Sequence, residues 1–355
     1  MTRTGATLPG PVLELDDLKV HFGGRARQAA IRAVDGVSLT IAPGETLGLI
    51  GESGSGKSTI GRAVLGLLQP QSGSVLVGGQ KIWEESRREQ RRSRSRVQVV
   101  FQDPSEALDP RMTVAASIQE PLRIRDRRHR SEHSEVAQRL LSQVGLDAAH
   151  GARRPHELSG GQRQRVNIAR ALVLQPDLIV CDEVVSALDV SIQAEILNLF
   201  AQLKREREIA YLFISHDLSV VAHVADRVAV MYLGVLMELG PVEQVVSAPR
   251  HPYTQALIAA QPQAVPSHLR RARPPALKGD IPSPASPPSG CRFRTRCPHA
   301  VQRCAEEVPA FKEDRPGHWV ACHFSEQLAA DPPAAREPHM TRITGPRTTT
   351  EGIIS

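Results

Sequence analysis

The segment Gly51–Thr59 has the residue types and the spacing of a phosphate-binding loop. Its sequence, GESGSGKST, fills the pattern G-x-x-x-x-G-K-S/T and follows the apolar run Thr46–Ile50. The glycines allow tight turns that point backbone N–H groups at phosphate oxygens. A helix that begins at Lys57 directs its positive end at the same anion, while Lys57 reaches the β- and γ-phosphates and the Ser58 hydroxyl suits Mg²⁺. The loop therefore predicts a nucleoside triphosphate site rather than a plain turn between a strand and a helix.

Two carboxylates, Asp182 and Glu183, follow a second apolar run, Leu178–Cys181. At the carboxyl end of a buried strand, Asp182 is expected to face Mg²⁺ and Glu183 to polarise a water for in-line attack on the γ-phosphate. His216 follows another apolar run, Ala210–Ser215, and is expected to donate to the γ-phosphate and to hold that water. Taken alone, such a pair can also be acidic residues that merely close a strand. Together with the loop, these residues predict phosphate hydrolysis.

Two further polar segments join this set. Gln102 ends a strand expected over Val97–Phe101, on the side where α/β sheets bind ligands, and from there it can reach the metal or the attacking water. Ser159 is placed as a helix N-cap with Gln162 three residues later, and the two glycines between them present bare N–H groups. This helix start predicts a second anion site, since two consecutive glycines are otherwise unfavourable in a helix.

The elements that would position these residues alternate as in an α/β protein. Alternating segments at 12–22 and 33–41 predict a small antiparallel sheet that leads into the phosphate loop. Phe22, at the end of the first, can stack on an adenine ring or be one more apolar strand residue. The mixed charge run at 84–96 indicates a solvated helix face or loop, and residues 104–157 predict a charged helical insertion.

Composition bounds the partners. The 355 residues are long for one domain, which predicts a large domain with an appendage or two domains. The net charge of +6 comes mostly from Arg, but aromatics make up only 3%, too few for a base-stacking surface, so nucleic acid is not expected. The Arg excess also suits an anionic membrane face. With neither a secretory signal nor about 18 apolar residues in a row, the chain is expected to be soluble and cytoplasmic.

The cysteines divide into one buried, inert thiol and a C-terminal group. Cys181 lies in an apolar strand, and a cytoplasmic location argues against disulfides. A Pro-rich linker, 282–290, precedes the other four, whose C-x5-C-x6-C-x17-C spacing indicates a metal clip in a segment too short to bury its own core. The spacing suits iron–sulfur ligation somewhat better than zinc, and four free thiols remain the alternative. The group comprises Cys291, Cys297, Cys304 and Cys322.

Over roughly residues 12–262, the chain resembles the nucleotide-binding subunit of an ATP-binding cassette (ABC) transporter. The resemblance rests on the loop, Gln102, Leu158–Gln162, Asp182–Glu183, Ser186–Asp189 and His216, in that order. Segments GESGSGKST, FQDP, VSALDVS and HPYTQAL are similar to the oligopeptide/dipeptide/nickel importer branch, which carries a C-terminal cysteine region. The resemblance implies an α/β P-loop NTPase cassette with a RecA-like core sheet, an antiparallel β subdomain and a helical signature subdomain. The expected domains are 12–262 for the ATPase and 263–328 for a Cys-rich extension, with 1–11 and 329–355 disordered.

The family resemblance also implies a mechanism. Two cassettes sandwich two ATP molecules, so Ser159 and Gly161 would contact the γ-phosphate of the other subunit, and Asp189 would communicate across the dimer. Gln102 would sense Mg²⁺ and report to a permease lodged against the helical insertion, and Phe22 becomes the expected adenine platform. Val184 stands where the branch usually has proline, and activity is expected to survive this change. Some members of the branch carry a 4Fe–4S cluster at the C-terminal cysteines, so the resemblance implies a possible cluster here.

The implied function is ATP hydrolysis that energises the import of oligo- or dipeptides. One alternative is the import of nickel or another small solute, and a less favoured one is a soluble ABC ATPase without a role in transport. The implied partners are two membrane permeases, an extracytoplasmic solute-binding protein and a second ATPase subunit, at the cytoplasmic face of the membrane. The catalytic candidates are Lys57, Gln102, Glu183 and His216, and the magnesium ligands Ser58, Gln102 and Asp182. The nucleotide-binding candidates are Phe22, Gly51, Glu52, Ser53, Gly54, Ser55, Gly56, Lys57, Ser58, Thr59, Gln102, Ser159, Gly160, Gly161, Gln162, Asp182 and Asp189.

Overall fold

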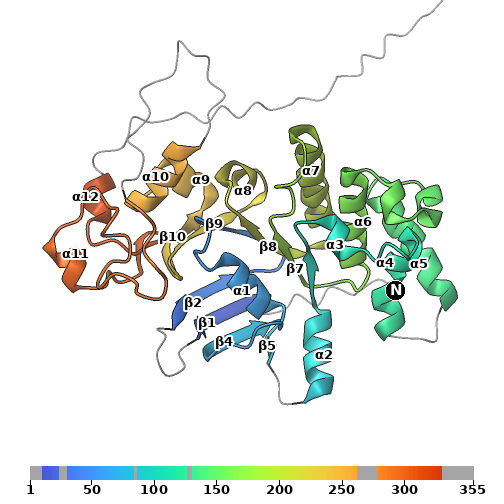
Figure 1. The fold of residues 1–355 in the computed structure, drawn as a ribbon, viewed down its shortest axis with the longest axis horizontal. Coiled ribbons are helices and arrows are strands. Elements are labelled where there is room, and N and C mark those ends of the chain that lie inside the picture. The colour runs from blue at the N-terminus through green and yellow to red at the C-terminus, as the bar shows by residue number, and fades with distance from the viewer. Residues whose placement is uncertain (1–9, 24–29, 84–85, 126–129, 262–278, 330–355) are drawn as a thin grey trace, which may run out of the picture.

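The computed structural model describes residues 10–23, 30–83, 86–125, 130–261 and 279–329. Within these ranges, two sheets and their covering helices are arranged in layers, with the helical insertion 104–157 at one end and the C-terminal segment at the other (Figure 1). The expected disorder of the first residues and of 330–355 lies outside the described residues, as does the start of the Pro-rich chain, 262–278.

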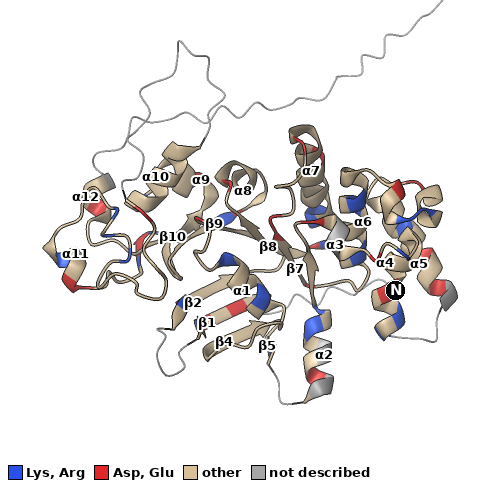
Figure 2. Cartoon of the chain, in the orientation of Figure 1, with Lys and Arg blue, Asp and Glu red and all other residues tan. Residues whose placement is uncertain are grey.

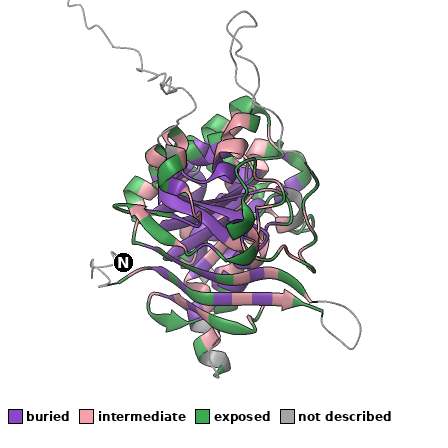
Figure 3. Cartoon of the chain, turned by 90° about the vertical axis from the view of Figure 1, so that its left-hand side faces the viewer, coloured by how far each residue is buried: buried purple, intermediate pink, exposed green. Residues whose placement is uncertain are grey.

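The larger sheet positions the chemistry. Its strand order is β11-β12-β10-β9-β3-β8-β7-β6, and the strands from β9 to β6 run parallel. The predicted apolar runs form its interior, as expected for parallel strands that are covered on both faces, and buried residues gather at the centre of the molecule (Figure 3). The strands are β3 (Thr46–Ile50), β6 (Val97–Val100), β7 (Leu178–Asp182), β8 (Ala210–Ser215), β9 (Arg227–Tyr232), β10 (Val235–Pro241), β11 (Lys312–Arg315) and β12 (His318–Val320).

The smaller sheet has the order β2-β1-β4-β5. The predicted antiparallel pairing of the two N-terminal strands is confirmed: Leu13 lies opposite Ile41, and Val20 opposite Val34. Buried and exposed residues alternate along β1, because one face of the sheet packs on the core and the other faces solvent. The strands are β1 (Leu13–Phe22), β2 (Ile31–Ile41), β4 (Ser72–Val77) and β5 (Gln80–Lys81).

Helices cover the larger sheet and form the insertion. The mixed charge run is a helix, α2, capped by Ser86, and charges of both signs are spread over the helices of the insertion (Figure 2). Two short 3-10 turns, Ala148–Ala152 and Pro155–Glu157, precede Leu158–Gln162, the segment called the signature below. The helices are α1 (Lys57–Val64), α2 (Arg87–Ser95), α3 (Pro104–Ala107), α4 (Val114–Arg125), α5 (Arg130–Gln143), α6 (Gly160–Leu172), α7 (Val190–Arg207), α8 (Leu218–Val224), α9 (Val242–Ser247), α10 (Pro252–Ala260), α11 (Gln302–Glu306) and α12 (Ser325–Ala329).

The C-terminal segment packs directly against the cassette. Strand β12 pairs antiparallel with β10, with Glu238 opposite Val320, and Phe293 is fully buried in the same hydrophobic cluster as the parallel strands. Glu238 and His318 are both fully buried and joined by a 2.7 Å contact between Oε1 and Nε2. The extension and the cassette share a sheet and a hydrophobic core. The expected division into two domains near residue 262 stays a prediction. In the part of the chain that the structure describes, no helix is long and apolar enough to cross a membrane.

Candidate functional site

The loop Gly51–Gly56 connects the central strand β3 to helix α1, as the sequence predicts. Gly51 has φ 154° and Gly56 φ 106°, and a Cβ on either would lie within 2.2 Å of a backbone oxygen, of Met231 and Ala33 respectively. Glycine is therefore required at both positions. Ser53 and Gly54 form the exposed tip, whereas Ser55 is buried and Thr59 lies half-buried in α1. The loop is held on one side by neighbouring strands and open at its tip.

The Lys57 ammonium lies inside this loop. Nζ donates to the carbonyl oxygens of Gly51 at 2.7 Å and Glu52 at 3.0 Å. Burial lowers the pKa of Lys57, although the charges of Glu183, Asp182 and Glu52 oppose that shift. The ammonium is thus positioned beside the loop and inside the field of three carboxylates.

The two predicted magnesium ligands on the loop and β7 come together. Ser58 Oγ donates to Asp182 Oδ1 at 3.2 Å, between residues 124 positions apart. Burial raises the pKa of Asp182, and the hydrogen bond from Ser58 opposes that shift. Mg²⁺ accepts hydroxyl and carboxylate oxygens as ligands. Because the two oxygens lie next to each other, this pair fits the ion.

The remaining candidates of this edge form a chain of contacts. His216 Nδ1 lies 3.1 Å from Glu183 Oε1. Gln102 donates from Nε2 to Ser186 Oγ at 3.2 Å, and that hydroxyl donates to the Glu183 carbonyl at 2.9 Å. Glu183 has a left-handed φ of 50°. This backbone conformation is unfavourable for any residue other than glycine, and such strain is typical of functional sites. The structure thus brings Gln102, Glu183 and His216 together at the carboxyl ends of β6, β7 and β8.

Val184, which stands where the importer branch that the sequence resembles usually has proline, is buried. Its carbonyl accepts a hydrogen bond from Gln164 Nε2 at 2.9 Å, from the interior of α6. The contact ties the turn after Glu183 to the helix that begins at the signature. Survival of activity with valine here stays a prediction.

The predicted second anion site lies apart from the phosphate loop. Ser159 caps α6 in a reciprocal box with Gln162: Ser159 Oγ accepts from the Gln162 N–H at 3.3 Å, and Gln162 Oε1 accepts from the Ser159 N–H at 3.0 Å. Gly160 is exposed, and a Cβ on Gly161 would lie 2.8 Å from Ile192 Cγ2. Figure 1 shows α6 on the side of the insertion, away from α1. Within one chain, the structure does not bring the signature to the loop.

Two other candidates occupy exposed positions. Asp189 stands at the start of α7 without a side-chain capping bond, and Gln193 of α7 holds the preceding turn by donating to Val185 and Leu188 carbonyls at 2.9 Å. Phe22 ends β1 with 40% of its surface exposed. Gln193 was not singled out from the sequence, because a glutamine inside a helix gives no signal of its own.

The sequence also missed two residues that hold the phosphate loop from the C-terminal side. The Glu52 N–H donates to Tyr253 Oη at 2.9 Å, and Arg296 makes two hydrogen bonds to the Glu52 carboxylate, at 2.6 and 3.0 Å. Tyr253 lies in the HPYTQAL segment, but its polar neighbours give no sign that its hydroxyl has a partner in the loop. The Arg296 contact spans 244 positions, and nothing local in the sequence indicates it.

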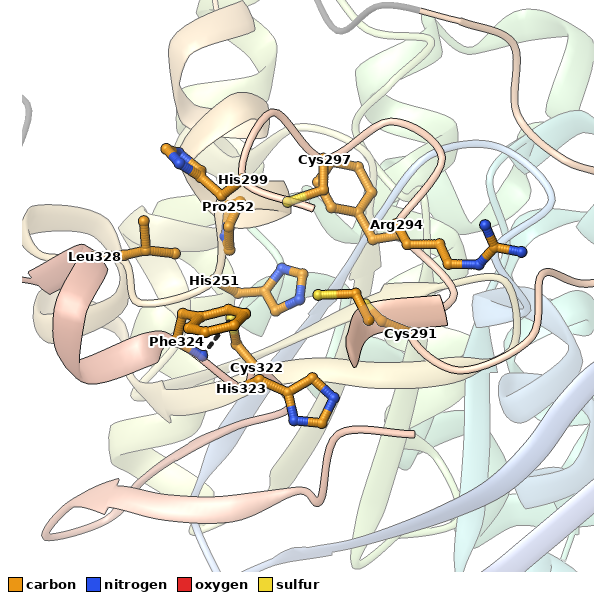
Figure 4. A pocket seen from close by; sticks show the side chains of 12 residues that line it. His251, Pro252, Cys291, Arg294, Cys297, His299, Cys322, His323, Phe324 and Leu328 are labelled. Atoms are coloured by element: carbon orange, nitrogen blue, oxygen red, sulfur yellow. Dashed lines mark hydrogen bonds between the residues drawn. The ribbon is translucent and has the colours of Figure 1, made fainter. Parts of the chain in front are cut away.

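The four C-terminal cysteines line one pocket (Figure 4). Figure 4 shows Cys291 and Cys297, from one short segment, and Cys322, from a later one, around the pocket, with His251 near its middle and Phe324 beside Cys322. Burial raises the pKa of the Cys297 and Cys322 thiols to about 11, and the neighbouring cysteines add to the shift. Among the described residues, no group of three or more His, Cys, Asp or Glu side chains is arranged to hold a metal ion.

Comparisons with known proteins agree with this geometry. Residues 34–186 match the family described as ABC transporter, and residues 237–304 match the oligopeptide/dipeptide transporter C-terminal region. The chain is 49% identical over 319 residues to the oligopeptide transport ATP-binding protein AppF of Bacillus subtilis, covering 88% of this chain and 97% of that protein.

Two solved structures are similar. CbiO1 of Clostridium perfringens, part of the ABC transporter complex cbiONQ, superposes with a TM-score of 0.60 at 27% identity, over 66% of this chain and 90% of that one. The ATP-binding cassette MJ0796, a dimer in a post-hydrolysis state bound to ADP and Pi, gives a TM-score of 0.58 at 28% identity, over 65% of this chain and 98% of that one.

Proposed function

The chain belongs to the ATP-binding subunits of ABC transporters, in the oligopeptide/dipeptide group, and from this premise we propose how its residues energise peptide import. The cassette fold expected from the sequence is confirmed, and the chain is an ATPase. The observation that carries the proposal is the convergence, at one edge of the parallel sheet, of the phosphate loop, the Ser58–Asp182 pair and the Glu183–His216 pair.

We assign the roles by position and chemistry. The backbone N–H groups of 54–58 and the Lys57 ammonium bind the phosphates, and Glu183 accepts a proton from the attacking water. His216, 3.1 Å from Glu183, orients that carboxylate and would donate to the γ-phosphate. Ser58, Asp182 and Gln102 would hold Mg²⁺, which when bound neutralises charge on the β- and γ-phosphates. Phe22, exposed at the end of β1, provides the adenine platform.

The separation of the signature from the loop supports a two-subunit site. An anion-binding helix start that cannot reach the loop of its own chain can serve a second copy or a paralogue, with Ser159, Gly161 and Asp189 at the interface. The related cassette that is dimeric with ADP and Pi supports the same arrangement. The partners proposed for the assembly are two permeases and an extracytoplasmic binding protein, with this subunit at the cytoplasmic face of the membrane.

Peptide uptake in the native host tests the function. A strain without this subunit should lose uptake of a labelled dipeptide or oligopeptide, and expression of the wild-type chain should restore that uptake. The chain purified from the restored strain should carry two membrane permeases with it. Recovery of the chain as a lone species on ribosomes or DNA, with uptake intact in the deletion strain, would overturn the transport function.

We also propose that the cysteine pocket holds a 4Fe–4S cluster. Support comes from the four thiols that line one pocket, which is the ligand number that such a cluster needs. A cluster binds each thiolate at a different iron, so it does not require the sulfurs to meet at one point.

Metal analysis after anaerobic purification tests the cluster. The wild-type chain should be brown and contain iron, and Cys297→Ser should lose both the colour and the iron. Cys181→Ala, which removes the buried thiol of β7, is the matched control and should keep the iron. Stoichiometric zinc without iron would replace the cluster with a zinc site, and the absence of both metals would leave the thiols as packing residues.

A further inference from the structure

The phosphate loop rests on an ion pair that reaches it from the C-terminal extension. The Arg296 guanidinium is bidentate on Glu52, and only 7% of the Arg296 side chain and 24% of the Glu52 side chain are exposed. The guanidinium also lies over the Tyr232 ring, 5.8 Å from its centroid. A bidentate pair combines charge with fixed direction, so Arg296 fixes the place of Glu52 more firmly than an exposed pair would.

Glu52 in turn fixes the working groups of the loop. Its carbonyl accepts from the Ser55 N–H at 3.2 Å and from Lys57 Nζ at 3.0 Å, and its N–H is held by Tyr253 Oη. A displacement of Glu52 would therefore move both the turn that carries the phosphate-facing N–H groups and the ammonium that meets the β- and γ-phosphates.

A second arginine of the same segment reaches the loop through the β9–β10 hairpin. Arg292 donates to the Leu233 carbonyl and pairs with Asp35. The next hairpin residue, Gly234, donates its N–H to the Ser55 carbonyl at 2.9 Å. The segment 291–297 thus contacts the loop directly at Glu52. It is also linked to Ser55 through the β9–β10 hairpin.

These two arginines adjoin two cysteines of the pocket. Arg292 follows Cys291 and Arg296 precedes Cys297, and both cysteines line the pocket (Figure 4). A change in the pocket that shifts this short segment would be transmitted to the loop through the two guanidinium groups.

We propose that Arg296 is a positioning residue for ATP binding, through which the segment 291–297 of the extension sets the nucleotide affinity of the phosphate loop. The inference rests on the proposed ATPase function. Because Arg296 contacts Glu52 and neither Glu183 nor His216, it acts on affinity rather than on the chemical step.

Steady-state hydrolysis and equilibrium ATP binding by the purified transporter complex test this role. Arg296→Gln and Glu52→Gln each remove the pair from one side, and each should raise KM and Kd for ATP about tenfold with kcat changed less than about threefold. Arg296→Lys, which keeps the charge without the bidentate geometry, should fall between wild type and Arg296→Gln. Arg303→Gln removes an exposed Arg–Glu pair on α11 of the same extension and should leave all values unchanged.

Double variants test the route. Arg296→Gln with Glu52→Gln should bind ATP no more weakly than either alone, since both remove the same interaction. Cys297→Ser should weaken ATP binding in the wild-type background and add nothing in the Arg296→Gln background. Unchanged KM in Arg296→Gln and Glu52→Gln, a fall in kcat at constant KM, or fold-changes that multiply in either double variant would overturn the proposal.

Folding and function are controlled separately. Near-ultraviolet circular dichroism identifies a variant that does not fold, and Glu52→Gln carries the test if Arg296→Gln fails in this way. If the wild-type complex hydrolyses no ATP, the proposed function fails, whereas normal hydrolysis with insensitive KM removes only the role of Arg296.

Discussion

At the residue scale, the site depends on side chains that meet although they are far apart in the sequence. Ser58 and Asp182, and likewise Glu183 and His216, meet because parallel strands place their carboxyl ends at one edge of the sheet. The left-handed backbone of Glu183 is held by its own N–H, which donates to the Ile214 carbonyl at 3.0 Å. The surrounding strands therefore maintain the conformation that aims this carboxylate.

Substitution of Glu183 and Lys57 separates chemistry from binding. Glu183→Gln removes the proposed proton acceptor and keeps the shape, so kcat should fall about 100-fold or more while ATP binding persists and a closed dimer accumulates. Lys57→Ala removes the ammonium proposed to bind the phosphates and should abolish ATP binding itself. Nucleotide-dependent size-exclusion profiles and steady-state rates measure both, and wild-type turnover in Glu183→Gln would exclude it as the base.

The residues of this edge were accessible from the sequence because their types are rare in such positions. A Lys-Ser pair after a glycine loop and two carboxylates after a buried run each indicate a chemical role. Arg296 and Tyr253 were not accessible, because an arginine between cysteines and a tyrosine in a helix have many uses. Only the fold shows that both converge on Glu52.

At the element scale, the parallel strands were predicted from short apolar runs together with the segments that bound them. Thr46–Ile50 and Ala210–Ser215 are buried throughout. Periodicity alone cannot distinguish such a run from a buried helix, so the short length of each run and the polar loop that follows it indicated a strand. The pairing of β12 with β10 could not be predicted in this way. Strand β12 has only three residues, His318–Val320, and a long stretch of chain separates it from β10. Local periodicity therefore cannot indicate which strand it pairs with or in which register.

The start of α10 contains a buried histidine that makes stability depend on pH. His251 Nδ1 accepts from the Tyr253 N–H at 3.0 Å, and burial lowers the pKa of His251 to about 3. Between that value and about 6.5, the unfolded chain binds one proton more than the folded chain, so the free energy of unfolding falls as pH falls. Burial raises the pKa of the neighbouring Glu238, which opposes this trend at the acidic end of the range.

Replacement of His251 by asparagine isolates that contribution. Asn keeps an N-cap acceptor and does not titrate. When the pH falls from 7.5 to 5.5, the free energy of unfolding should therefore decrease by about 1.4 kcal/mol less in the variant than in the wild type. Denaturant unfolding at the two pH values measures the difference. Equal losses in both proteins would show that His251 is not buried in its neutral form.

At the scale of the whole molecule, the extension is part of the core. Phe293 lies 5.4 Å from the Tyr232 ring and 5.3 Å from the Tyr253 ring, centroid to centroid. Arg250 of the cassette and Asp314 of the extension form a buried pair. The linker composition predicted a tethered appendage, but composition cannot show what a segment packs against.

Truncation tests this dependence. A chain that ends at Gln261 loses Phe293 and the partner strand of β10, and since burial of one Phe contributes about 3–5 kcal/mol, its Tm should fall by at least about 10 °C. A chain that ends at Ala329 loses no described contact and is the matched control. Calorimetry that finds the same Tm for both truncations would contradict an integral role for the extension.

The position of β12 has a consequence for how the protein is made. During synthesis, β10 (Val235–Pro241) leaves the ribosome well before its partner β12 (His318–Val320), and at about 5–20 residues per second this delay of nearly 80 residues lasts roughly 4–16 s. Throughout that interval, the backbone groups on the edge of β10 that faces away from β9 lack their β12 partner, and an unpaired strand edge is a template for aggregation. Each nascent chain therefore passes through a stage in which chaperone protection matters most, and a codon change that slows translation between these strands would lengthen it.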